Sequence, residues 1–345
     1  MAAAGGMLEA MPPLSPTAPA APVAVVTARD IRALSLPTRG LLRIRHGVYV
    51  ARELWDAAPP WERYRIRVAA FRLSDPAAIL AFESAAVALG LPVFDEPRDI
   101  HVFAPERGSS TRYGDICVHT SRDDRQIVDT PLGQATALAD TVVDLARVLP
   151  PAQALAVADA AASPFQRANA SFRTDPGAVS ALVAARIDRR GRARVRWVCE
   201  RMDGRAESTL ESMSRAAIEW YGFESPELQR EFRYEGHHDR ADFLFPSVGA
   251  IGEADGWSKY GLLDAAEAAS RMAAEKRRED RLRCAGHPFA RWEHRDVVAT
   301  GRLERILLDA GVRRLRAPHP AYLATLSSNP RARRREPPPA PRVTR

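Results

Sequence analysis

Residues 240–260 are RADFLFPSVGAIGEADGWSKY, and this stretch places acidic side chains inside apolar runs. We expect two strands joined by a turn at Pro246–Ser247, because both runs are apolar and Pro and Ser favour turns. Period-two alternation places Glu253 and Asp255 on one face of the second strand, while Asp242 lies on the first. Burying ionised carboxylates costs several kcal/mol unless a cation or several donors compensate. The stretch therefore predicts a hairpin that holds a metal ion or a dense hydrogen-bond network.

The composition indicates a globular protein with a large core. The chain has 345 residues, of which 46% are hydrophobic, so we expect two domains with tails. Cys117, Cys199 and Cys284 lie far apart without metal-ligand spacing, which argues against a disulfide framework and fits a reducing cytoplasm. The sequence contains neither an apolar run of roughly 18 residues nor a signal-peptide pattern. We therefore expect a cytoplasmic protein without a membrane partner.

The charge balance favours a polyanionic partner such as DNA. The formal net charge is +7, and arginines cluster in the C-terminal stretch and again between Arg186 and Arg201. Of the 50 basic residues only Lys259 and Lys276 are lysine, and both follow the predicted hairpin. Since lysine supplies a compact charge with a shiftable pKa, their position indicates a role beside the acids.

The first ordered segment combines a short helix with a basic hairpin. Residues 27–34 predict a helix with a Thr cap, and residues 41–50 predict a hairpin that turns at His46–Gly47. This segment resembles the wing of AbiEi-type antitoxin N-terminal domains, in a truncated form without the preceding helices. The resemblance implies phosphate contacts by four arginines, Arg29, Arg32, Arg43 and Arg45. A solvated face on a small structural hairpin is the alternative interpretation.

The middle of the chain alternates helices and strands. Its stretches SAAVALGLPV (residues 84–93) and TVVDLARVLP (residues 141–150) resemble the central region of AbiEi-like proteins. Helices are expected at 61–73 and 77–89, with strands around His101 and His119. We interpret these two histidines as packed residues rather than a metal pair, because no third ligand is in view.

The last third of the chain adds an acid on a helix to the acids of the hairpin. Glu211 lies on the flank of a helical apolar stripe, and a long helix, a strand and a last helix follow the hairpin. This order predicts an α/β fold, a mixed sheet flanked by helices. An acid on a helix, Asp on a strand and Glu on the next strand is the layout of PD-(D/E)XK nucleases.

Four stretches resemble one branch of that superfamily, the proteins related to very-short-patch-repair endonucleases: LESMSR, RADFLFP, GEADGWSKY and EKRREDRLRCAGHPFARW. The resemblance implies a restriction-endonuclease-like sheet and Mg²⁺ held by Glu211, Asp242 and Glu253. Asp255 stands where the general pattern has lysine. We therefore name Lys259 and Lys276 as the residues that supply the catalytic charge.

The expected organisation is a disordered leader (1–22), an AbiEi-like region with a truncated winged helix (23–165), a helical bridge (166–205), a nuclease-like domain (206–318) and a basic Pro-rich tail (319–345). We predict a DNA-binding protein with a Mg²⁺-dependent endonuclease-like domain. The alternative is a DNA-binding regulator or antitoxin-like protein in which the nuclease fold is only a scaffold. A fold-stabilising acid network in a protein-interaction module, and a toxin or second copy as partner, stay open.

Overall fold

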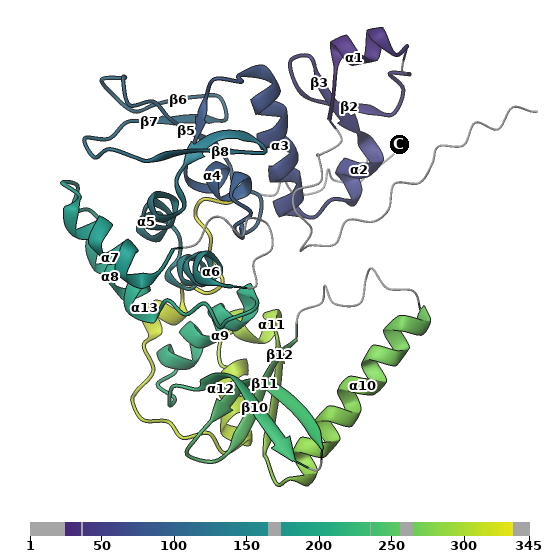
Figure 1. Ribbon diagram of the computed structural model, residues 1–345, viewed down its shortest axis with the longest axis vertical. Helices are drawn as coiled ribbons and strands as arrows, with labels where there is room; N and C mark the ends of the chain where they lie inside the picture. The colour runs from purple at the N-terminus through teal and green to yellow at the C-terminus, as the bar shows by residue number, and fades with distance from the viewer. Residues whose placement is uncertain (1–24, 36, 165–173, 235, 256–264, 334–345) are drawn as a thin grey trace, which may run out of the picture.

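The computed structural model describes residues 25–35, 37–164, 174–234, 236–255 and 265–333. These residues form a mixed α/β fold with three sheets, which confirms the expected fold class. Figure 1 shows the N-terminal module and the C-terminal sheet at opposite ends, with the middle region between them along one side.

The N-terminal module is a three-stranded sheet with two short helices. Its elements are β1 (Val25–Thr27), α1 (Ala28–Ala33), β2 (Leu41–Arg45), β3 (Val48–Ala51) and α2 (Arg52–Ala57), with sheet order β1-β3-β2. Thr27 accepts a hydrogen bond from the backbone of Asp30 and so caps α1. The predicted cap and the hairpin turn at His46–Gly47 are both confirmed.

The middle region packs helices on a six-stranded sheet of order β6-β7-β5-β4-β9-β8. Its elements are α3 (Pro60–Ser74), β4 (Ile79–Leu80), α4 (Phe82–Ala88), β5 (Ile100–Phe103), β6 (Thr111–Tyr113), β7 (Ile116–His119), β8 (Ile127–Thr130), β9 (Gly133–Thr136), α5 (Leu138–Val148) and α6 (Pro151–Ala162). The expectation of one helix over 77–89 is wrong at its start. Ile79 and Leu80 pair with Phe103 and Val102 instead, so a sheet contact overrides helix propensity there.

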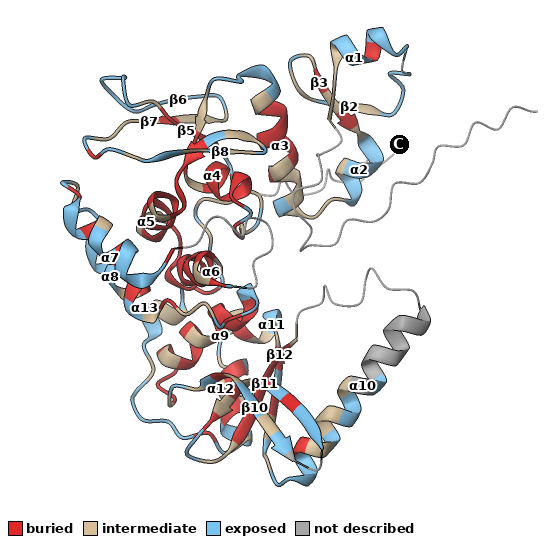
Figure 2. Ribbon diagram, viewed as in Figure 1, coloured by how far each residue is buried: buried red, intermediate tan, exposed pale blue. Residues whose placement is uncertain are grey.

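Two helices, α7 (Pro176–Ala185) and α8 (Arg192–Arg201), lie along the edge of this region. Figure 2 shows α5 and α6 largely buried, while α7 and α8 present an exposed face. Arg186 is not part of that exposed face, because its guanidinium lies buried between Asp140 and Asp144. The arginine cluster expected from the sequence therefore divides into a buried structural residue and exposed ones.

The C-terminal part is a mixed four-stranded sheet of order β10-β11-β12-β13, in which only β12 and β13 run parallel. Its elements are α9 (Thr209–Trp220), β10 (Glu227–Tyr234), β11 (His237–Phe245), β12 (Ala250–Asp255), α10 (Ala265–Cys284), β13 (Phe289–Glu293), α11 (His294–Val298), α12 (Arg302–Asp309) and α13 (Pro320–Leu323). The predicted hairpin is confirmed as β11 and β12. Strand β10 was not expected, since few of its residues are apolar.

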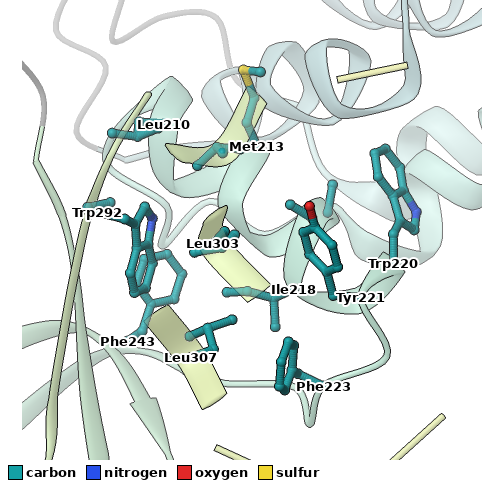
Figure 3. Close-up of a cluster of buried hydrophobic side chains, with 14 of the residues drawn as sticks. Leu210, Met213, Ile218, Trp220, Tyr221, Phe223, Phe243, Trp292, Leu303 and Leu307 are labelled. Atoms are coloured by element: carbon teal, nitrogen blue, oxygen red, sulfur yellow. The ribbon is translucent and has the colours of Figure 1, made fainter. Parts of the chain in front are cut away.

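One face of this sheet packs against α9 and α12 through aromatic and aliphatic side chains (Figure 3). The ring of Phe243 lies 5.3 Å from that of Trp292. Gly252 is required beneath Trp292, because an added Cβ would lie 2.5 Å from the indole. On the other face, Leu282 of α10 packs against Ala241 and Ile251. The two cores hold the acid-bearing strands between helices.

The C-terminal part also packs against the middle region. Leu155 of α6 belongs to the same buried cluster as Leu210 and Met213 of α9. Beyond α12, residues 320–333 turn back to the middle region, where Arg333 donates its backbone N–H to the carbonyl of Glu96 at 2.7 Å. Part of the stretch expected as a tail is therefore folded. In the described residues, none of the helices has the length and apolar character that a membrane crossing requires.

Candidate active site

Three carboxylates approach one another where α9 meets the strands of the hairpin. Glu211 comes from the first turn of α9, Asp242 from β11 and Glu253 from β12. The charge of Asp242 contributes to the pKa of both glutamates, so the structure brings these three predicted residues into one electrostatic cluster. Below, "acid cluster" means Glu211, Asp242 and Glu253.

Glu211 is fixed by the cap of its own helix. The hydroxyl of Ser208 donates to Glu211 Oε1 at 2.8 Å, and the backbone N–H of Glu207 donates to Oε2 at 2.9 Å. Burial raises the pKa of Glu211 to about 7, and the negative charge of Asp242 adds to the rise. Glu211 is thus held by its helix cap and has a pKa well above that of an ordinary glutamate.

Glu253 is the most strongly perturbed acid of the cluster. The residue is 3% exposed, and Arg278 of α10 donates from Nη2 to its Oε2 at 2.9 Å. The other oxygen, Oε1, is buried and has no hydrogen-bond partner in the described part of the chain. Burial raises the pKa of Glu253 to about 8, Asp242 adds to the rise, and Arg278 opposes it. One oxygen is therefore left without compensation.

Asp242 lies between the two glutamates and has weaker partners of its own. Its Oδ2 accepts the backbone N–H of Ala254 at 3.0 Å, and its Oδ1 is 3.5 Å from the side-chain amide of Gln229. A backbone amide and a distant side-chain amide compensate a carboxylate less than an arginine does. The cluster as a whole thus carries more negative charge than its protein partners balance.

Gln229 of β10 is a site residue that the sequence did not indicate. Its amide donates to Glu211 Oε2 at 2.9 Å, and its own Oε1 is buried without a partner among the described residues. Its backbone has φ +53°, a left-handed conformation that is rare for non-glycine residues and concentrates at functional sites. No local pattern marks such a residue, because its neighbours are ordinary strand residues.

The side chains of β10 pack into different cores on the two sides of Gln229. Leu228 packs in the core between α9 and the sheet, whereas Phe232 packs with Ala241 and Ile251 on the side of α10. Simple alternation would place Leu228 and Phe232, four residues apart, on the same face. The partner strand β11 makes the same change, because Ala241 packs on the side of α10 and Phe243 on the side of α9, so both strands pass from one core to the other at the level of Gln229 and the acid cluster.

Of the other predicted catalytic residues, Asp255 and Lys276 are not gathered at the acid cluster. Asp255 is half-exposed and pairs with Arg291 at 3.3 Å. Lys276 is exposed, and it precedes Arg278 on α10 at a two-residue spacing, which turns it roughly 200° away from the arginine that contacts Glu253. Lys259 lies outside the described residues. Among the described residues, Arg278 contacts the cluster through Glu253, and the sequence did not indicate this arginine.

The oxygen atoms at the acid cluster are of the chemical type that binds a hard divalent cation. Carboxylate and amide oxygens are the ligands that Mg²⁺ prefers, and the unpartnered oxygens of Glu253 and Gln229 are of this kind. In the described part of the chain, no group of three His, Cys, Asp or Glu residues is arranged to hold a metal ion as it stands. Asp242 and Glu253 are therefore the residues that would hold the ion, with Gln229 and Glu211 beside them.

Of the four arginines predicted to contact DNA, three are exposed and the fourth, Arg45, pairs with an aspartate. Arg29, Arg32 and Arg43 are exposed, and none of the three forms a salt bridge in the described part of the chain. Arg45 instead donates from Nη2 to both oxygens of Asp115, at 2.9 and 3.0 Å, and lies over the ring of Phe71. Arg45 thus attaches the hairpin to the middle region.

Comparison with known proteins finds a similarity over about one third of the chain. The chain is 36% identical over 115 residues to two uncharacterised proteins of Mycobacterium tuberculosis, one from each of two strains, and this is 33% of the chain. The match spans 40% of the length of each of these relatives. No protein-family model and no solved structure matches the chain.

Proposed function

We propose that this is a DNA-binding protein whose C-terminal domain hydrolyses phosphodiester bonds with Mg²⁺ in a restriction-endonuclease-like fold. The observation that carries the proposal is the undercompensated acid cluster, in which burial, together with the charge of Asp242, raises the pKa of both Glu211 and Glu253. Strongly perturbed acids that gather from separate elements are typical of functional sites. Their order, an acid on a helix followed by acids on two paired strands, supports the nuclease assignment.

Each residue has a defined part in this proposal. Asp242 and Glu253 would hold the ion, which supplies charge stabilisation and an activated water when bound. Gln229 contacts Asp242 Oδ1 and donates to the capped Glu211, so it orients the two acids relative to each other. Arg278 takes the place of the motif lysine beside Glu253. Because a guanidinium stays charged, Arg278 positions a phosphate or balances charge and does not act as a general base.

The test is cleavage of supercoiled plasmid by purified protein with Mg²⁺ or Mn²⁺. We expect nicking by the wild type and a loss of at least about 100-fold in the Glu253→Ala variant, as for a group that stabilises the transition state directly. Asp280→Ala is the matched control, since Asp280 is an exposed acid on α10. Equal nicking by wild type and Glu253→Ala, or none by either, rules out catalysis at this cluster.

A second candidate function is DNA binding without catalysis, through a winged-helix-like N-terminal module. The observation that favours it is the exposed set of Arg29, Arg32 and Arg43 on α1 and β2. We expect charge reversal at Arg29 and Arg43 to weaken binding to duplex DNA and to lower the slope of log K against log salt by about one per lost phosphate contact. Unchanged binding by that variant excludes the module as the DNA contact.

Arg45 gives the matched control for that experiment. Because it pairs with Asp115 and lies over Phe71, its reversal acts on the attachment of the hairpin and not on a free phosphate contact. Arg45→Glu should lower thermal stability more than Arg43→Glu does.

A further inference from the structure

A second buried acid, far from the acid cluster, binds an arginine from the end of the chain. Glu83, at the start of α4, accepts from Nε and Nη2 of Arg331, which lies 248 residues later, and the Nη2 contact is 2.6 Å. Nη2 also lies 2.9 Å from Nε2 of His101. The carboxylate is 4% exposed and the arginine 22%, so the guanidinium enters a buried pocket from the surface.

The walls of this pocket match a planar guanidinium. The ring of Phe82 lies 5.6 Å from the Arg331 guanidinium carbon. His101 bonds to His119 at 2.8 Å, and the ring of Phe82 lies 4.4 Å from that of His119, which confirms the interpretation of these histidines as packed. A two-pronged carboxylate contact and an aromatic face recognise arginine rather than lysine.

Phe82 is itself strained. Its φ is +47°, a conformation that is a genuine outlier for a bulky residue. Such strain persists only where the surroundings impose it, and it concentrates at ligand-holding sites. The strain directs the Phe82 ring and the adjacent Glu83 carboxylate toward one guanidinium.

The backbone from Arg331 to Arg333 is held by residues 96–98 at the edge of the middle region. Arg98 donates its N–H to the carbonyl of Arg331 at 2.9 Å, and Arg333 donates to the carbonyl of Glu96 at 2.7 Å. Pro97 and Ala332 form an antiparallel bridge between these two bonds. Pairing of an extended segment along an edge, combined with a pocket for one side chain, is a recurring mode of peptide recognition.

We propose that the edge from Phe94 to Arg98, together with the pocket of Phe82, Glu83 and His101, is a recognition site for an arginine-bearing extended peptide. Its ligand is the chain's own segment, residues 329–333, which begins with Asn329, whose side-chain amide donates to the carbonyl of Phe94 at 3.3 Å. By filling the site, the segment fastens the C-terminal domain to the middle region. This assignment rests on contacts outside the acid cluster and does not depend on nuclease activity.

The test uses the full-length double variant Arg331→Ala/Arg333→Pro, which lacks the guanidinium and the backbone N–H that bonds to Glu96, and a synthetic peptide with the sequence of residues 327–333. We expect the variant to bind this peptide at least tenfold more tightly than the same peptide with lysine at position 331, by fluorescence anisotropy. Wild type should bind neither peptide, because its site is filled. Arg333→Ala should also bind neither, because Arg331 still fills the pocket. If the double variant binds the two peptides equally, or binds neither, the proposal is overturned.

If the variant that lacks Arg331 does not fold, two arginine-to-lysine substitutions test the same pocket through thermal stability. Arg331→Lys retains the charge but loses the two-pronged contact, whereas Arg333→Lys alters an exposed contact with Glu96. We expect the melting temperature of Arg331→Lys to lie several degrees below that of Arg333→Lys. Equal melting temperatures contradict a guanidinium-specific pocket.

Discussion

Glu83 and Glu253 are buried to nearly the same extent, but their pKa values shift in opposite directions. Their side chains are 4% and 5% exposed, and each contacts one arginine. Although burial acts to raise the pKa of Glu83, Arg331 outweighs it and the pKa falls below its ordinary value. The pKa of Glu253 rises to about 8 through burial and the charge of Asp242, which Arg278 does not balance.

The difference separates a compensated acid from an undercompensated one. Arg331 contacts both oxygens of Glu83, whereas Arg278 contacts one oxygen of Glu253 and leaves the other unpartnered. A compensated buried charge adds to the specificity of the fold. An undercompensated buried carboxylate would be stabilised by a bound cation. Burial alone does not distinguish the two glutamates; the number and sign of their neighbours do.

The largest expected effect is the loss of the compensated pair. Glu83→Gln leaves Arg331 without a counter-charge, and breaking a buried pair in this way costs about 3–5 kcal/mol. Because the folded-state pKa of Glu83 is lowered, its contribution is present above the unfolded value of 4.5 and is lost as pH falls through the folded value. Urea unfolding at pH 7 measures the change. A loss below about 1 kcal/mol contradicts the assignment of Glu83 as a structural acid.

Metal binding should distinguish the acid cluster from the compensated pair. We expect Mn²⁺ at 100 times its Kd to stabilise the wild type by about 2.7 kcal/mol. Affinity should rise between about pH 6 and 8.5, because the pKa of the ligand Glu253 is about 8 and that of the neighbouring Glu211 is about 7, and the loss of either proton strengthens the attraction for a cation. Calorimetric titration at several pH values checks this, with Asp242→Asn as the variant that should lose binding. A pH-independent affinity contradicts coordination by these acids.

Neutralising the undercompensated acid should stabilise the protein at alkaline pH. The folded-state pKa of Glu253 is raised, so the folded protein binds more protons and wild-type stability falls as pH rises from about 4.5 to about 8. Glu253→Gln removes this fall, and we expect a gain on the order of 2 kcal/mol at pH 8.5 and little change at pH 5. Urea unfolding at both pH values measures it. A variant less stable than wild type at pH 8.5 shows that Glu253 is adequately compensated.

The smallest effect concerns the strained residue beside the cluster. Gln229→Gly relieves the left-handed backbone at φ +53° and should change stability by no more than about 1 kcal/mol. It also removes the amide that contacts Glu211 and Asp242, so Mn²⁺ affinity should fall about tenfold, as for other outer-shell changes. Thermal unfolding and calorimetric titration separate the two effects. Unchanged metal affinity shows that the strain at Gln229 has no part in the site.

Much of the fold followed from local patterns. Alternation in residues 240–255 predicts the hairpin, and helical spacing predicts the helix that carries Glu211; both are present. The helix expected over 77–89 begins later because Ile79 and Leu80 pair with a strand about 20 residues further along the chain. Strand β10 escaped prediction because its residues are mostly polar.

The candidate site was predicted less completely, for a different reason. The acids were found because carboxylates in apolar strands are unusual at the level of composition. The lysines were named for their rarity, but an arginine on the same helix, two residues after Lys276, contacts Glu253. Which side chain reaches a site depends on the rotation of α10 against the sheet, and that rotation is set by Leu282 and its partners across the core.

The sequence by itself determined that three acids occur on a helix and two strands of an α/β fold, since residue type and periodicity act within a few positions. Only the tertiary structure decided which buried glutamate is balanced. The partner of Glu83 lies 248 residues away at Arg331, while Asp242 and Arg278 reach Glu253 from other elements. Charge compensation depends on distances in space, and segments remote in sequence set those distances only when the chain folds.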